Sequence, residues 1–156
     1  GLGDVYKRQA KPRITAAAID MITKDVKIRV RYNETDKMGI VHHSNYIYYY
    51  EMARGELMRS LGVTYREMEE QGVLLIVREV QSVYYASAYY DDVLTVRVSL
   101  KKEPTVKSEF DYEIFNEQGT LLNTGKVVLA SVNSETHRPC KPPKWFIELY
   151  RTHSRD

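Results

Sequence analysis

The sequence predicts a single α+β domain, in which a five-stranded antiparallel sheet packs against one long helix. One stretch, residues 46–61, has apolar residues at helical spacing, whereas five others have the period or composition of strands. A sheet of five strands must bury its apolar face, and this helix is the only long one available to cover it. The length of 156 residues fits one domain with its own core.

The first predicted strand spans residues 26–32, where apolar and charged side chains alternate. Such alternation is typical of a strand with one buried and one wet face. The apolar positions are Val26, Ile28, Val30 and Tyr32. Residues 33–41 break this period and contain Gly39, which predicts a loop.

This loop leads into the long helix, for which Ser44 is the predicted N-terminal cap. The apolar face of the helix carries Tyr46, Tyr50, Ala53, Leu57 and Leu61. Gly62 is predicted to end it, since a glycine commonly follows the last turn. Thr64 and Glu67 have the spacing of a capping box, which predicts a second, shorter helix that ends near Gly72.

Four further strands are predicted in the second half of the chain. Residues 73–85 begin as a continuous apolar run, which favours a strand covered on both faces. The other three are residues 94–100, 109–114 and 121–132. Residues 116–119 have the composition of a hairpin turn, and the proline-containing residues 139–143 are predicted to end regular structure.

Composition argues against several classes of protein. Hydrophobic residues make up 43% and charged residues 28%, as in ordinary globular domains. The net charge of +2 gives no reason to expect a nucleic-acid partner. No apolar run reaches the ~18 residues of a membrane span, and no signal-peptide core is visible. A single cysteine, Cys140, excludes a disulfide within the chain, and we expect the cytoplasm.

Tyrosine is the one unusual component, with 13 residues against one tryptophan and three phenylalanines. Its ring is apolar while its hydroxyl needs a hydrogen-bond partner, which suits partly solvated pockets and subunit contacts. Filling of the core is the alternative use.

Both ends of the chain are expected to lie outside the domain. Residues 1–20 show neither a strand nor a helix pattern, and Met21 has the character of a start. We therefore expect residues 1–20 to be a non-native or disordered leader. The single domain is expected over residues 21–150, followed by a tail at 151–156.

The reactive residue types concentrate between residues 32 and 46, where the predicted loop runs into the helix. Carboxylate, imidazole and phenol groups lie together there, on Asp36, His42, His43, Tyr32 and Tyr46. Unpaired N–H groups at a helix N-terminus can polarise a carbonyl oxygen. A nearby carboxylate can attack the carbonyl carbon or take a proton from water. From spacing alone, an aspartate before a glycine is more often a turn or capping residue.

No metal or other cofactor is predicted. His42 and His43 are adjacent, so their side chains diverge, and His137 with Cys140 gives thin support for a metal site. The sequence also lacks a Gly-Lys-Ser/Thr phosphate loop and a Gly-x-Ser-x-Gly nucleophile motif.

Residues 32–54 resemble the signature of the 4-hydroxybenzoyl-CoA and YbgC-like thioesterases of the hot-dog superfamily. That signature reads Tyr-x-x-Thr-Asp-x-x-Gly-x-Val, then a Tyr or His pair, then Asn-Tyr and Glu-x-Ala-Arg. The matching residues are Tyr32, Thr35, Asp36, Gly39, Val41, His42, His43, Asn45, Tyr46, Glu51, Ala53 and Arg54. A second match covers residues 83–86 and 90–94, and the similarity extends from about Val26 to Trp145.

The resemblance implies the hot-dog fold, in which an antiparallel sheet wraps around a helix. It implies hydrolysis of a short- to medium-chain, or aromatic, acyl-CoA to a free acid and CoA. It also implies a homodimer whose sheets join edge to edge, often extended to a homotetramer, with the active sites at the dimer interface. Members of this family need no metal. Two alternatives stay open: a thioesterase that acts on acyl carrier protein, and a non-catalytic acyl-CoA-binding protein.

The site residues of the family transfer to matching positions here. Asp36 matches the catalytic carboxylate, which acts as nucleophile or general base. His43 matches the residue whose backbone N–H faces the thioester carbonyl and whose imidazole assists, and Tyr32 matches a tyrosine that lines the site. Substrate contacts are expected from Gly39, Val41, His42, Tyr46 and Glu51.

Two features of the carried-over site have alternatives. Glu51 is either a second carboxylate that acts on water or a buried structural partner of Arg54. Coenzyme A carries phosphates, so basic side chains should hold it. Lys107 and Arg138 fall near positions that contact the nucleotide in related enzymes, and the nearby alternatives are Lys101, Lys102 and Lys141. The run of residues 41–43 is closer to the YbgC-like branch, which favours short or medium aliphatic acyl groups.

Overall fold

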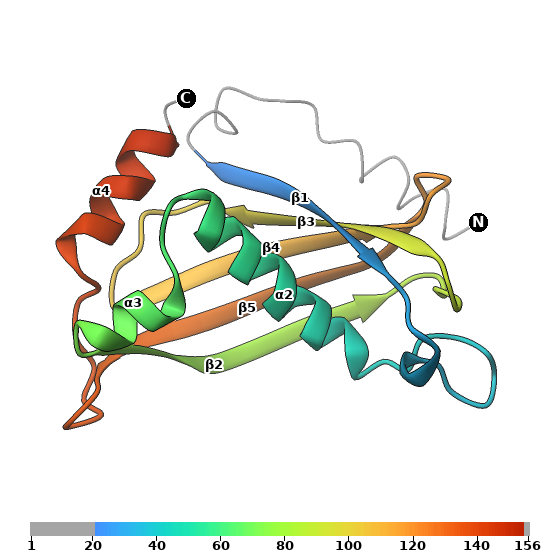
Figure 1. Ribbon diagram of the computed structural model, residues 1–156, viewed down its shortest axis with the longest axis horizontal. Coiled ribbons are helices and arrows are strands. Elements are labelled where there is room, and N and C mark those ends of the chain that lie inside the picture. The colour runs from blue at the N-terminus through green and yellow to red at the C-terminus, as the bar shows by residue number, and fades with distance from the viewer. Residues whose placement is uncertain (1–20, 155–156) are drawn as a thin grey trace.

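The computed structural model describes residues 21–154, which form one antiparallel sheet with a long helix across one face (Figure 1). The five strands lie in the order β1-β3-β4-β5-β2. They are β1 (Ile22–Arg29), β2 (Val73–Tyr84), β3 (Val93–Leu100), β4 (Lys107–Phe115) and β5 (Leu121–Asn133). The helices are the short 3₁₀ helix η2 (Tyr32–Glu34), α2 (Asn45–Ser60), α3 (Tyr65–Glu70) and α4 (Lys144–His153). The predicted α+β fold is confirmed, and the predicted leader at residues 1–20 lies outside the described residues.

The core lies between α2 and the inner face of the sheet. The buried side chains of α2 follow the spacing of three and four residues that the sequence predicts. They are Tyr46, Tyr49, Tyr50, Ala53, Arg54, Leu57 and Met58. The buried side chains of the sheet include Leu94, Val96, Val98, Phe110, Tyr112, Ile114 and Val127. Gly62 follows α2 with a φ of +83°, which glycine adopts without strain, so the predicted helix end is confirmed.

The closest approach of α2 to the sheet is at Gly125 on β5. A Cβ atom on Gly125 would overlap the ring of Tyr50. That ring stacks on Tyr112 with a centroid distance of 4.4 Å. Its hydroxyl donates to Asn123 and lies 2.8 Å from the hydroxyl oxygen of Ser82. The absence of a side chain at Gly125 therefore lets a buried tyrosine reach polar partners within the sheet.

The first strand differs from the prediction at both ends. It begins at Ile22 rather than at residue 26, and it ends at Arg29, before Tyr32. Tyr32 lies in η2 with 78% of its surface exposed, so its predicted place on the buried face of the strand is wrong. The chain turns away from the sheet because the Glu34 carboxylate accepts a hydrogen bond from the Arg31 N–H and so starts η2.

The strand predicted to be covered on both faces, β2, is instead an edge strand. It pairs with β5 on one side and, among residues 21–154, with no strand on the other. Val73, Leu74 and Leu75 are half-buried, but the apolar side chains that follow are open to solvent, and Val77 is 55% exposed. The other exposed apolar residues on β2 are Ile76, Val80, Val83 and Tyr84. The continuous apolar run therefore marks a strand without a partner, which the sequence pattern alone does not distinguish from a central strand.

Regular structure does not end at residue 143 as predicted. The prolines lead into α4, with Pro143 at its N-cap position, and proline is well tolerated at a helix start. Phe146 and Tyr150 are buried, and the Tyr150 hydroxyl donates to the Lys101 carbonyl oxygen at 3.1 Å. Because α4 continues to His153, helical structure extends into the residues predicted as a tail.

Two local predictions are confirmed by hydrogen bonds. The Thr64 hydroxyl accepts from the Glu67 N–H at 3.2 Å and caps α3. The turn at residues 116–119 is closed by the Gly119 N–H, which donates to the Asn116 carbonyl oxygen at 3.0 Å. Between residues 21 and 154, no helix is both long and apolar enough to cross a membrane, and the cellular compartment stays a prediction.

We expect Gly125→Ala to lower the free energy of unfolding by about 2–3 kcal/mol, because the added methyl group displaces the Tyr50 ring from a packed core. Urea denaturation followed by circular dichroism measures this change. Gly55→Ala in α2 is the matched control. Its methyl group would meet only Arg59 at 3.9 Å, so the substitution should stabilise the protein by up to about 1 kcal/mol. If the Gly125→Ala variant and the wild type unfold at the same urea concentration, the Tyr50 ring does not require the space at residue 125.

Candidate active site

Asp36 lies in a tight turn that precedes α2. Its backbone N–H donates to the Ile40 carbonyl oxygen at 2.9 Å, and its own carbonyl accepts from the Gly39 N–H at 2.9 Å. Gly39 has a φ of +79°, a conformation that favours glycine and closes the turn. One carboxylate oxygen, Oδ1, accepts the Met38 N–H at 2.9 Å. Within residues 21–154 the other oxygen, Oδ2, has no hydrogen-bond partner, so Asp36 serves the turn while keeping an oxygen free.

Glu34 organises the loop around Asp36, although the sequence analysis assigned it no role. Its carboxylate Oε1 accepts from the Arg31 N–H at 2.8 Å and from the Tyr49 hydroxyl at 2.9 Å. Its carbonyl oxygen accepts from the His42 N–H and from the Asn45 side-chain amide, each at 2.9 Å. Burial and the neighbouring Glu34 raise the pKa of Tyr49 well above its ordinary value, so the phenol stays protonated as a donor. The spacing of three residues from Arg31 was the only sequence signal of this role.

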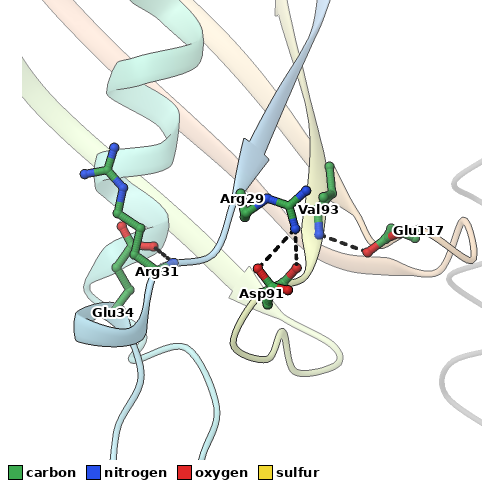
Figure 2. A network of polar contacts seen from close by, with 6 residues as sticks. All are labelled: Arg29, Arg31, Glu34, Asp91, Val93 and Glu117. Carbon is green, nitrogen blue, oxygen red and sulfur yellow. Dashed lines mark hydrogen bonds and ion pairs between the residues drawn. The ribbon is translucent and has the colours of Figure 1, made fainter.

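A second polar network fixes the adjoining ends of β1 and β3, as Figure 2 shows. Arg29 Nη1 contacts the Asp91 carboxylate and carbonyl oxygens, each at 3.1 Å. The Val93 N–H donates to the Glu117 carboxylate at 3.0 Å, which links the start of β3 to the β4–β5 turn. These contacts hold the base from which the Asp36 loop extends.

In the part of the chain that the structure describes, no side chain caps the start of α2. Ser44 occupies the predicted N-cap position, but its hydroxyl lies 2.8 Å from the His42 ring nitrogen instead of binding a helix N–H. The reason is its backbone conformation, which is helical (φ −64°, ψ −26°) rather than the extended form typical of a capping residue. The backbone N–H of His43 also has no partner among residues 21–154. The N–H groups of Ser44, Asn45 and Tyr46 are already bonded to His42 and His43, so the His43 N–H is the donor available to an incoming carbonyl oxygen.

Tyr84, at the end of edge strand β2, packs against this helix start. Its hydroxyl donates to the His43 carbonyl oxygen at 3.0 Å. Its ring meets the rings of His43 and Tyr46 edge-on, with centroid distances of 6.5 and 5.1 Å. Tyr84 belongs to the second matching segment of the sequence, but no role was assigned to it there. The contact links the candidate site directly to the exposed edge of the sheet.

The predicted substrate-contacting residues differ in exposure. Gly39 and His42 are exposed, whereas Val41 is 4% and Tyr46 is 2% exposed. Burial raises the pKa of Tyr46 to about 12, so this phenol is neutral. Val41 and Tyr46 therefore support the loop and the helix start from beneath in this chain. Their contact with a substrate stays a prediction.

Tyr32 lies beside the site on the outside of the loop. Its ring meets Tyr90 edge-on at a centroid distance of 5.7 Å. It lines a cavity of about 500 Å³ that also includes Glu34 and Met52 but not Asp36. The predicted role of Tyr32 at the catalytic centre stays a prediction.

Glu51 is not the buried partner of Arg54, so this alternative is wrong. Glu51 is exposed, and Arg54 donates instead to the hydroxyls of Tyr65 at 2.7 Å and Tyr112 at 3.1 Å. The Glu51 side chain extends into solvent, whereas that of Arg54 is buried against the two tyrosines. Both residues line a cavity of about 380 Å³ between α2, α3 and β2.

The predicted CoA-binding residues lie at the other end of the sheet from Asp36. Lys107 is at the start of β4, opposite Ala130, and Arg138 follows β5 in the loop before α4. Both are exposed. α2 has 16 residues and so separates the two ends of one subunit by about 24 Å. Within residues 21–154, no cluster of three or more His, Cys, Asp or Glu side chains is arranged to hold a metal ion.

Comparisons with known proteins agree on one family. Residues 30–149 match the thioesterase-like superfamily. The chain is 30% identical over 124 residues to the acyl-CoA thioester hydrolase YbgC of Escherichia coli O157:H7, covering 80% of this chain and 92% of that protein. It is 33% identical over 132 residues to the acyl-CoA thioesterase YbgC of Helicobacter pylori, covering 80% and 97%. A DHNA-CoA thioesterase from Staphylococcus aureus superposes with a TM-score of 0.78 at 33% identity, covering 85% of this chain and 89% of that one.

We expect Glu34→Ala to lower the free energy of unfolding by about 1–3 kcal/mol, because it leaves the buried Tyr49 hydroxyl without a partner. Chemical denaturation measures the loss. In the Glu34→Ala background, Tyr49→Phe should cost less than in the wild type, since the partner of the hydroxyl is already gone. If the two substitutions lower the free energy of unfolding by additive amounts, Glu34 and Tyr49 are not coupled.

Proposed function

The chain belongs to the thioesterase-like superfamily, and from this we propose that it hydrolyses acyl-CoA thioesters to a free acid and coenzyme A. Relatives named as acyl-CoA thioester hydrolases align with most of this chain and of their own length. The observation that carries the proposal is the placement of Asp36, which has a free carboxylate oxygen in the loop that leads to the unpaired His43 N–H before α2. A free carboxylate oxygen and an unpaired N–H on the same loop suit attack on a thioester carbonyl.

The proposed mechanism assigns two roles to this arrangement. The thioester carbonyl oxygen accepts a hydrogen bond from the His43 N–H, and this bond together with the positive end of the α2 dipole stabilises the negative charge that develops on the oxygen. Asp36 then either attacks the carbonyl carbon and expels the CoA thiolate, or takes a proton from the attacking water. In the first route, water hydrolyses the resulting anhydride and regenerates the Asp36 carboxylate. Both routes release the same acid and thiol.

We also propose that two subunits pair through β2. The exposed apolar side chains and unpaired backbone of this edge strand support pairing with a second copy. A two-fold axis would set the two β2 strands antiparallel, so the Val73 end of one lies beside the Tyr84 end of the other. The end of the sheet that carries Lys107 and Arg138 would thus approach the partner's Asp36 loop, as CoA phosphate binding requires. A tetramer is compatible with this pairing.

The acyl group is proposed to be short to medium in length, or aromatic. The similarity to a thioesterase named for DHNA-CoA, together with the YbgC relatives, supports both classes. Two other functions are separable by experiment. A carrier-protein thioesterase would turn over acyl carrier protein faster than the matching acyl-CoA, and a binding protein would saturate with ligand without releasing thiol.

Asp36→Asn should lower kcat by about a hundredfold or more, because it removes the nucleophile or general base. Thiol release from a panel of acyl-CoAs of increasing chain length, with benzoyl and hydroxybenzoyl forms, provides the measurement. The matched control is Asp111→Asn on the outer face of β4, which should keep wild-type turnover. Turnover of the Asp36 variant within a few fold of the wild type would remove Asp36 from this role. Absence of turnover of every acyl-CoA by the folded wild-type protein would favour the carrier-protein or the binding-protein alternative.

Val83→Lys, on the proposed dimer edge, should shift the protein to monomers and reduce thiol release, since a lysine on an edge strand opposes pairing with a second strand. Size-exclusion chromatography with light scattering reports the mass. Lys27→Glu on the opposite edge strand β1 is the control and should leave the mass unchanged. A dimer that survives Val83→Lys with full activity would argue against pairing through β2.

A further inference from the structure

Arg54 is a buried cation without an anionic partner among residues 21–154. The residue is 7% exposed on the core-facing side of α2. Among residues 21–154 no carboxylate forms an ion pair with it, and its two hydrogen bonds go to tyrosine hydroxyls. Buried charges in proteins are normally paired, since an isolated ion in a low-dielectric interior is costly. The charge of Arg54 therefore requires an explanation.

The two tyrosines do not neutralise Arg54. Burial raises the pKa of Tyr65 to about 12 and raises that of Tyr112 as well, even though the adjacent guanidinium lowers both. Both phenols are therefore neutral at pH 7 and act as dipolar partners only. A guanidinium has five N–H donors, and these two bonds use two of them. Three donors are left without a partner among the described residues.

Arg54 also lines the cavity of about 380 Å³ between α2, α3 and β2. The other walls of this cavity are largely apolar and include Met68, Leu129 and the β2 residues Val73, Leu74, Leu75, Ile76 and Val77. A pocket with apolar walls and a single buried cation has the chemistry of a site for an apolar chain that ends in an anion. The planar guanidinium fork matches the two oxygens of a carboxylate.

Residues on the inner face of β2 lie between the cavity, which Val77 lines, and the candidate active site. The register with β5 places Val77, Val80, Ser82 and Tyr84 on that face, because their partners include the inner-face residues Val127 and Gly125. Val77, Val80 and Tyr84 are all exposed, and Tyr84 contacts His43 at the start of α2. Arg54 lies nine residues along α2 from Asn45, which is about 14 Å. Exposed and largely apolar side chains of β2 therefore lie between the proposed thioester position and the cation.

We propose that the Arg54 cavity binds a carboxylate at the far end of the acyl group, so that the preferred substrates are CoA thioesters of dicarboxylic acids. This inference rests on the proposed thioesterase function and specifies its substrate class. Arg54 is in this view a specificity-determining residue, which holds the remote end of the substrate while Asp36 acts at the thioester.

Two carboxylates line the same cavity and bear on the proposal. Glu51 and Glu69 are both exposed, so water and salt screen their repulsion of an incoming anion. Arg54 is buried, where the local dielectric is lower and an ion pair is stronger. Attraction to the buried guanidinium of Arg54 therefore outweighs repulsion by the two exposed carboxylates, and the inner part of the cavity favours an anion.

The test compares matched pairs of thioesters that differ only in the terminal carboxylate: hexanoyl and adipoyl, octanoyl and suberoyl, decanoyl and sebacoyl-CoA. For at least one length, wild-type kcat/KM should be about tenfold or more higher for the diacid thioester. Arg54→Met should lower the diacid-to-monoacid ratio about thirtyfold, because it removes one partner of a buried charge pair. Arg54→Lys should give a diacid-to-monoacid ratio between those of Arg54→Met and the wild type, since lysine keeps the positive charge but lacks the planar guanidinium that binds both carboxylate oxygens. Arg59→Met, on the exposed side of the same helix, should leave the ratio unchanged.

A second measurement does not depend on turnover. Free suberate should raise the melting temperature of the wild type more than octanoate does, and Arg54→Met should lose this difference. Efficient hydrolysis of monoacid thioesters without any diacid preference would overturn the Arg54 inference and keep the thioesterase function. If suberate raises the melting temperature only when Arg54 is present, and no thioester is hydrolysed, the anion site is supported and the proposed thioesterase function is contradicted.

Discussion

α2 crosses the sheet at Gly125, where the ring of Tyr50 occupies the space that a side chain would fill. This one close approach sets the height of the helix above the sheet, and so its path along the inner face (Figure 1). Two consequences for function follow from that path. The N-terminus of α2 emerges beside the Asp36 turn at one end, and Arg54 comes to lie against Tyr65 and Tyr112 further along. A helix held further from the sheet would place neither group correctly.

Tyrosine provides most of the polar contacts in the interior. Tyr49 binds Glu34, Tyr50 binds Asn123, and Tyr84 binds the His43 carbonyl. In each case a large ring fills the core or its margin, while the hydroxyl satisfies a polar group that would otherwise lack a partner. The abundance of tyrosine noted in the composition therefore serves both uses considered there, core filling and partly solvated sites. A neutral hydroxyl also satisfies N–H donors of Arg54 without cancelling its charge, which leaves that charge available to a ligand.

The sheet is covered from solvent on its inner face but not along its β2 edge. The inner face is covered by α2, and α3 and α4 lie at the end of the sheet opposite the Asp36 loop (Figure 1). β2 is left with exposed valines on both of its faces. The same strand holds Tyr84 against the helix start and provides a wall of the Arg54 cavity. The proposed subunit contact and the proposed substrate path therefore share one element, so loss of the first should affect the second.

The sequence by itself determined the fold class, the long helix with its glycine stop, the cap of α3 and the place of the reactive residues before the helix. These follow from local rules of periodicity, capping and turn chemistry, which depend on residues close in the chain. It did not determine that β2 is an edge, that helix α4 follows the prolines, or that Ser44 pairs with His42. Nor did it show Glu34 as the centre of the loop or Arg54 without a carboxylate. Each of these depends on partners distant in sequence or on the exact backbone conformation, and only the packed tertiary structure decides which groups meet.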